Sequence, residues 1–153
     1  MIQVRTVAVV RALALIGAAN VACAAEHPVW PGAEQDYVLH CRGCHGADGS
    51  GVPQRVPSVR GTLLRFMRAA AGREFVLRVP GAANSSLSDA ALTAVVNWMA
   101  LVYADGEDTS ATLWFSTTEV ASARRHPLLE VRKARSVVVR ELAANGIPMA
   151  DDY

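Results

Sequence analysis

The stretch Cys41-Arg42-Gly43-Cys44-His45 decides how the rest of this chain is interpreted. Two residues separate its two thiols, so a helical backbone places them about one turn apart. Thiols at this spacing can add to both vinyl groups of one haem, and the histidine that follows then lies beneath the iron. The motif therefore predicts that Cys41 and Cys44 hold one covalently bound haem c, with His45 at the metal.

Two other uses of a Cys-x-x-Cys pair compete with haem attachment. A zinc site needs a second pair of cysteine or histidine ligands at short spacing, and the chain has only one further cysteine, Cys23. A thioredoxin-type redox pair lies between a β-strand and a helix, whereas here a short polar helix is expected before the motif and a glycine-rich segment follows it. The pattern favours haem attachment over both.

The first 25 residues have the features of a secretory signal peptide. Their only charges are Arg5 and Arg11, an apolar run covers residues 12–21, and small residues follow at 22–25. The apolar run is shorter than the roughly 20 residues that span a bilayer, so a lasting membrane anchor is the weaker interpretation. We expect cleavage after Ala24 or Ala25, with lipidation of Cys23 as the alternative.

Without this leader about 128 residues remain, enough for one domain with its own core. Residues 26–153 carry 13 basic and 14 acidic side chains, and this balance gives no argument for binding nucleic acid. Cys23 leaves with the leader. The mature chain then keeps only the two cysteines of the motif.

Apolar spacing and capping residues predict an all-α protein. Ser88 is expected to cap a helix that ends near Tyr103. The apolar stripe of that helix consists of Leu92, Val95, Val96, Met99 and Val102. The other expected helices cover residues 33–41, residues 62–71 ended by Gly72, residues 74–79, a segment opened by the capping box from Ser116 to Glu119, and a final helix with Pro127 in its first turn that runs to about Ala144.

The residues around the motif resemble those of a known family. Residues 37–51, which continue after the motif as Gly46-Ala47-Asp48-Gly49-Ser50-Gly51, look like bacterial class I cytochromes c. Two later stretches, Pro57-Ser58-Val59-Arg60-Gly61 and Leu87-Ser88-Asp89, are similar to further landmarks of that family. The similarity covers roughly half of the mature chain.

This resemblance implies a class I cytochrome c fold over residues 26–104, with a C-terminal helical extension over residues 105–153 packed on it. In that family the motif histidine, here His45, is the proximal iron ligand. The backbone carbonyl at the position of Pro57 accepts the other imidazole N–H, which fixes the ring. Trp98, on the family's last helix, is expected to pack against the segment of Tyr37.

The sixth iron ligand is where the sequence departs from the family. Most class I cytochromes c supply it from a Met-Pro pair before the last helix, and here Val79-Pro80 stands at that place without a donor atom in Val79. Met99 is the candidate for the distal ligand, and Met67 is the other methionine that could substitute, although methionines at helical spacing commonly fill cores. His126 and His40 are the weaker candidates. A five-coordinate or water-ligated iron, with room for a small ligand, is the alternative.

Charge is distributed unevenly along the mature chain. Residues 42–78 contain seven arginines and two acids, whereas residues 89–119 contain five acids and neither lysine nor arginine. Arginines around an exposed haem edge would steer an acidic protein partner, with association rates that fall as salt screens the field. Solvated helix faces are the other explanation.

We therefore expect a periplasmic monohaem c-type cytochrome that carries single electrons between protein redox partners, and no enzymatic chemistry at a protein residue. The chain would orient haem c, surround it with a low dielectric and tune its potential. Two alternatives stay open: a haem-based sensor that binds a small ligand at an open distal site, and a haem subunit of a periplasmic dehydrogenase. No stable membrane span is expected after signal cleavage.

Overall fold

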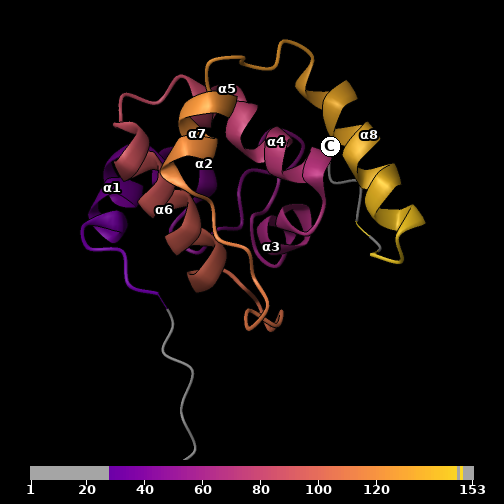
Figure 1. The fold of residues 1–153 in the computed structure, drawn as a ribbon, viewed down its shortest axis with the longest axis horizontal. Helices are drawn as coiled ribbons and strands as arrows, with labels where there is room; N and C mark the ends of the chain where they lie inside the picture. Colours follow the sequence, from indigo (N-terminus) through magenta and orange to yellow (C-terminus); the bar gives the residue numbers. More distant parts are fainter. Residues whose placement is uncertain (1–27, 148, 150–153) are drawn as a thin grey trace, which may run out of the picture.

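The computed structural model describes residues 28–147 and 149 of the chain. The predicted signal peptide, with Cys23, lies outside the described residues. Within them the chain forms eight helices and no β-strand, so the predicted all-α fold class is confirmed (Figure 1). None of the helices in this part of the chain is long and apolar enough to cross a membrane. The helices are α1 Ala33–His40, α2 Arg42–His45, α3 Thr62–Met67, α4 Ala70–Arg78, α5 Pro80–Ala83, α6 Asp89–Val102, α7 Thr117–Ala123 and α8 Val131–Ala144.

Helices α1 and α6 cross at a cluster of three aromatic rings. The centre of the Tyr37 ring lies 5.3 Å from that of Trp98 and 5.5 Å from that of Tyr103. Tyr37 is almost fully buried, and truncating a buried aromatic side chain costs about 3–5 kcal/mol. The expected contact between Trp98 and Tyr37 is confirmed, and it fixes the helix that leads into Cys41.

Helix α6 supplies the largest share of the central core. Its start is capped as predicted, because the Ser88 hydroxyl accepts a hydrogen bond of 3.2 Å from the backbone N–H of Ala91. The expected apolar stripe is wrong at one position, because Val102 is 51% exposed. It is the last residue of α6 and lies at the edge of the core. The four buried members are Leu92, Val95, Val96 and Met99.

The break between α3 and α4 comes earlier than predicted. Helix α3 ends at Met67 and α4 begins at Ala70, so Gly72 lies inside α4 and does not end the preceding helix. The physical reason is a close approach of backbones. A Cβ atom at Gly72 would lie only 2.1 Å from the carbonyl oxygen of Phe66. Glycine at this position allows the two helices to pack against each other.

Helix α7 packs on α6 and α4 and begins as the sequence predicts. The Ser116 hydroxyl accepts a hydrogen bond of 3.2 Å from the backbone N–H of Glu119. The apolar residues on either side of this cap, Phe115 and Val120, are both buried. The predicted cap by Ser116 is therefore confirmed, whereas the Glu119 carboxylate binds Arg73 and does not complete a capping box.

Helix α8 lies at the outer edge of the bundle, against α4 and α3 (Figure 1). It begins at Val131, so the prediction that Pro127 stands in its first turn is wrong. The backbone N–H of Leu128 instead donates to the carbonyl of Arg78 at 2.8 Å, outside any helix. Val138 and Leu142 are buried against Phe66, and the helix ends at Ala144 as expected.

The basic and acidic segments of the sequence pair with each other. Glu107, whose side chain is 16% exposed, binds both Arg65 and Arg68 at 2.8 Å. Isolated surface pairs contribute only about 0–1 kcal/mol, and shared carboxylates of this kind contribute more. Much of the charge asymmetry therefore serves the fold. Further pairs in the described part of the chain join Arg60 to Asp105 and Asp48, Arg73 to Glu119, and Arg124 to Asp89.

Candidate functional site

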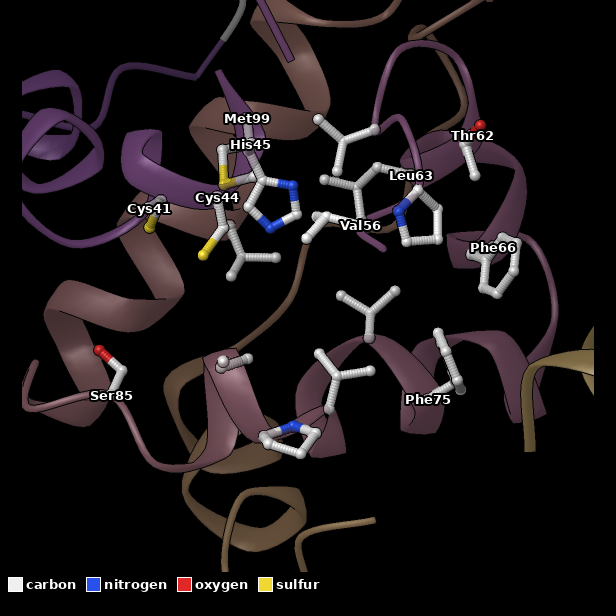
Figure 2. A pocket seen from close by; sticks show the side chains of 18 of the residues that line it. Cys41, Cys44, His45, Val56, Thr62, Leu63, Phe66, Phe75, Ser85 and Met99 are labelled. Carbon is white, nitrogen blue, oxygen red and sulfur yellow. The ribbon is translucent and has the colours of Figure 1, made fainter. Parts of the chain in front are cut away.

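The Cys-x-x-Cys-His motif forms a single helical turn directly after α1. The backbone N–H groups of Cys44 and His45 both donate to the carbonyl of Cys41, at 3.1 Å and 3.0 Å. This turn brings both thiols and the imidazole to one cavity (Figure 2). Neither cysteine forms a disulfide in the described part of the chain. The three residues that the sequence singled out are thus brought together.

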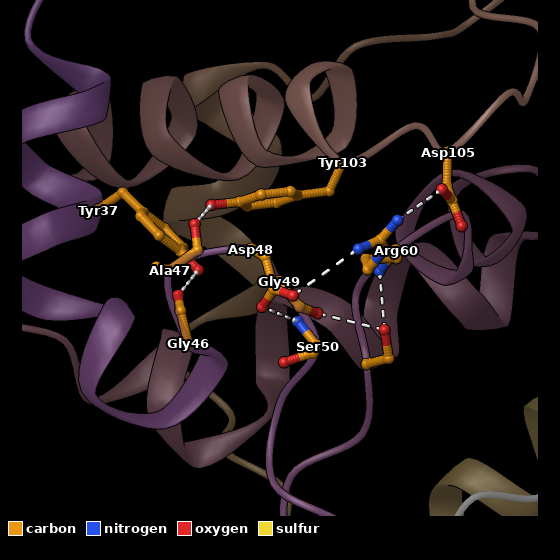
Figure 3. A network of polar contacts seen from close by, with 10 residues as sticks. Tyr37, Gly46, Ala47, Asp48, Gly49, Ser50, Arg60, Tyr103 and Asp105 are labelled. Atoms are coloured by element: carbon orange, nitrogen blue, oxygen red, sulfur yellow. Dashed lines mark hydrogen bonds and ion pairs between the residues drawn. The ribbon is translucent and has the colours of Figure 1, made fainter.

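Two tyrosine hydroxyls hold the loop that follows His45. The Tyr37 hydroxyl donates to the carbonyl of Gly46 at 2.6 Å, and that of Tyr103 donates to the carbonyl of Ala47 at 3.1 Å (Figure 3). Both tyrosines belong to the aromatic cluster at the crossing of α1 and α6. The crossing of α1 and α6 therefore also holds in place the backbone segment that follows His45.

Gly51 closes this loop back onto the motif. Its φ is +73°, and its N–H donates to the carbonyl of His45 at 3.0 Å. A Cβ atom here would lie 2.2 Å from the carbonyl oxygen of Val56 and 2.8 Å from that of Pro57. Only glycine fits both the backbone conformation and the space. The result is that Val56 and Pro57 reach the wall of the cavity that holds His45.

The cavity has a volume of about 420 Å³ and a mainly apolar lining. His45 lies on one side of it in Figure 2, and α4, which carries Phe75, runs along the opposite side. Seven of the helices, all except α7, and the loop before α3 contribute to its walls. The apolar side chains of the lining include Val56, Val59, Leu63, Phe66, Phe75, Val76, Val79, Leu92, Val95, Val96 and Met99.

Burial sets the ionisation of the motif. It lowers the pKa of His45 below its ordinary value, which favours the neutral imidazole that can bind a metal. Burial, with smaller contributions from Asp36 and Cys44, raises the pKa of Cys41 to about 11. The Cys41 thiol is therefore protonated at neutral pH. This does not suit a thioredoxin-type pair, which depends on a stabilised thiolate.

The Nδ1 atom of His45 is buried and makes no hydrogen bond with any described residue. Pro57 lines the same cavity, but the expected bond from the imidazole to the Pro57 carbonyl is not formed in this geometry and stays a prediction. An unpaired buried polar atom costs about 1–3 kcal/mol. Such an atom is rare in folded proteins and calls for an explanation, of which a group bound in the cavity is one.

The candidates for a sixth ligand lie in different places. Met99 lines the cavity, but Figure 2 shows it on the side of His45 and not on that of α4. Met67 is buried in the core outside the lining, and His126 is exposed and also outside it. His40 is an exposed residue of the lining. Met99 as the distal ligand stays a prediction. Its position on the same side of the cavity as His45 does not favour that role.

The wall that faces His45 offers no side chain able to ligate iron. Helix α4, helix α5 and the residue between them contribute hydrocarbon side chains to the lining: Phe75, Val76, Val79, Pro80 and Ala82. The sequence identified Val79-Pro80 as the departure from the family pattern, and the structure places both residues in this wall. A metal ion held by His45 would meet an apolar surface on its other side.

One residue of the lining was missed by the sequence reasoning. Arg135 of α8 is only 1% exposed and lies in the cavity wall together with Val131. The signal was available, because Arg135 stands three residues before Val138 and seven before Leu142, on the apolar face of α8. Charged residues are seldom this deeply buried.

Among the described residues, no three His, Cys, Asp or Glu side chains lie close enough together to hold a metal ion. Comparisons of the chain with protein-family models, with curated proteins and with solved structures gave no match. The features of the chain that bear on its function are the chemistry of the motif and the cavity around it.

Proposed function

We propose that this protein is a periplasmic monohaem cytochrome c, of class I fold with an added C-terminal helical segment, that carries single electrons between protein partners. The observation that carries the proposal is the convergence of Cys41, Cys44 and His45 on one apolar cavity. Two thioethers and an imidazole are the protein bonds of a c-type haem.

The residues of the cavity fit this cofactor. Cys41 and Cys44 both line it, so both thioethers can form at its edge. The neutral imidazole of His45 is available as the proximal ligand, and its buried Nδ1 atom can donate to a backbone acceptor such as Pro57. The apolar walls suit the faces of a porphyrin.

Each part of the chain then has a distinct task. Haem c supplies a one-electron iron couple, and the apolar lining lowers the local dielectric and excludes water from it. Cys44 is exposed, so the edge with the thioethers is the side from which a partner gains access. The exposed arginines Arg42 and Arg55, in the motif and in the cavity lining, are available to an acidic partner.

The proposal is tested by producing the full chain together with a cytochrome c maturation system and titrating it electrochemically. We expect one reversible one-electron wave, a c-type spectrum and electron exchange with an acidic partner protein that slows as salt is added. The matched variants are R42Q with R55Q, which should reduce this salt dependence, and R125Q, an exposed arginine outside the cavity lining, which should not. A haem protein that cannot be reduced and reoxidised reversibly would contradict the proposal.

A second function is favoured by the hydrocarbon wall of α4 and α5. Without a protein ligand opposite His45, the iron would keep an open position for a small neutral molecule such as carbon monoxide, nitric oxide or oxygen. Adding carbon monoxide to the reduced protein separates the two functions. Rapid and complete binding favours a ligand-binding sensor, whereas a six-coordinate, low-spin spectrum that ignores the gas favours the carrier.

A further inference from the structure

Arg135 brings a charged group into the apolar lining of the cavity. Its residue is 1% exposed, and the carbon at the centre of its guanidinium lies 5.6 Å from the centre of the Phe66 ring. The neighbours of Arg135 on the same face of α8, Val138 and Leu142, are buried hydrocarbon. A guanidinium at the edge of an apolar cavity favours an anionic group inside it, because charge-assisted hydrogen bonds strengthen where water is excluded.

Helix α8 is fixed to both sides of the cavity. Arg132 donates to the carbonyl of Gln54, in the loop before α3, at 3.3 Å. The segment leading into α8 is tied to the end of α4 by the bond from Leu128 to Arg78. These two attachments hold the helix across one end of the cavity, where Val131 and Arg135 complete the lining.

This end is the one opposite the cysteines. In Figure 2, Cys41 and Cys44 lie at one end of the opening, and Phe66 and Phe75 lie at the other. Arg135 is placed at the second end by its contact with the Phe66 ring. In a haem, the two vinyl groups and the two propionates stand on opposite edges of the ring. Thioethers at the cysteines therefore direct the propionates toward Arg135.

The charges of the lining agree with this orientation. All the lining residues belong to the described part of the chain, and none of them is an aspartate or a glutamate, whereas Arg55 and Arg135 both line the cavity. Two propionate carboxylates would thus meet cationic side chains in this lining. A planar guanidinium can hold a carboxylate through two parallel hydrogen bonds.

We infer that Arg135 binds a haem propionate, and that α8 is a cofactor-binding element that closes the propionate end of the cavity. This inference rests on the proposed haem site. A fixed positive charge near the iron favours the reduced form, so Arg135 also raises the reduction potential. The C-terminal segment then contributes to the redox function as well as to the fold.

The test uses the full-length, haem-loaded protein and three variants, R135Q, R135K and R140Q. Arg140 is an exposed arginine on the same helix and controls for the loss of one charge. The two measurements are the midpoint potential and the propionate bending band in the resonance Raman spectrum. R135Q is expected to lower the potential and shift the band. R135K keeps the charge but not the two-bond geometry, so it should keep most of the potential and still shift the band.

R140Q should change neither measurement. The inference is overturned if both Arg135 variants match the wild type in potential and in the Raman band. If R135Q does not accumulate as a folded protein, the Raman band of R135K decides. A wild-type chain that carries no covalent haem would overturn the proposed function itself, and this result is seen before any variant is compared.

Discussion

The side chain of Asn97 exchanges two hydrogen bonds with the backbone of Phe115. Its amide nitrogen donates to the Phe115 carbonyl, and the Phe115 N–H donates to its oxygen, both at 2.9 Å. Asn97 is 1% exposed and Phe115 is 3% exposed. This pair ties the middle of α6 to the segment that leads into α7, and so joins the C-terminal segment to the core beside the cavity.

Replacing Asn97 with alanine should lower the free energy of unfolding of the haem-loaded protein by about 2–4 kcal/mol. The change leaves two buried backbone groups of Phe115 without partners, and each costs about 1–3 kcal/mol. Urea unfolding followed by circular dichroism measures the loss. Asn84→Ala, at an exposed position after α5, is the matched control and should change stability little. Equal stability of the two variants would show that the Asn97 bonds do not support the fold.

Gly72→Ala should destabilise the protein by about 1–3 kcal/mol, because the added methyl group meets the Phe66 carbonyl at the contact of α3 and α4. Gly81→Ala, in α5, has nothing within 4 Å of its new Cβ and should be neutral or slightly stabilising. Thermal unfolding of both variants measures the difference. If Gly72→Ala were as stable as Gly81→Ala, the close approach of these helices would be wrong.

Glu107→Gln should weaken the fold at neutral pH and have no effect in acid. Hydrogen bonding by the Arg65 guanidinium, followed by the charges of Arg65 and Arg68, holds the pKa of Glu107 below its usual value of about 4.3. A depressed pKa stabilises the folded state above the unfolded pKa, and this contribution is lost as pH falls through the folded pKa. We expect a loss of about 1–2 kcal/mol at pH 7.

Urea midpoints of wild type and Glu107→Gln measured from pH 7 downward should therefore converge on the acidic side of about pH 4. Glu74→Gln is the control, because Glu74 pairs with Arg78 on an exposed helix face and should contribute little at any pH. A constant difference between wild type and Glu107→Gln over the whole range would contradict the role of the ionised carboxylate.

If the iron of the proposed haem has no protein ligand opposite His45, Val79→Met should make it six-coordinate. Val79 lies in the wall that faces His45 and directly precedes Pro80, and methionine adds the sulfur that this wall lacks. Val79→Leu is the matched control, with a similar side-chain size and no donor atom. We expect carbon monoxide to bind the reduced Val79→Met protein more weakly than the control, with a new iron–sulfur band in the oxidised spectrum. Equal gas binding in the two variants would show that Val79 does not face the iron.

Much of the fold follows from local signals in the sequence. The caps at Ser88 and Ser116 are local hydrogen bonds between a hydroxyl and a backbone N–H three residues away, so the sequence alone predicts them. Gly72 was misread because a glycine that ends a helix and one that admits a neighbouring backbone look the same in sequence. The difference depends on where Phe66 lies in space.

The candidate site, like the fold, was predictable from the sequence only in part. Cys41, Cys44 and His45 are neighbours in the chain, and their spacing predicts their shared cavity directly. Arg135 reaches that cavity from a helix that begins more than eighty residues later. No local pattern predicts on which element α8 packs, although an arginine on its apolar face could have drawn attention.

The most direct test of the account is the mass and spectrum of the exported protein, produced together with a cytochrome c maturation system. We predict a coloured chain whose mass after denaturation includes one haem, with a pyridine haemochrome of the c type and no free thiol at Cys41 or Cys44. Cys44→Ser should leave the haem singly attached or easily lost. A colourless wild-type chain with both thiols free would contradict the central claim.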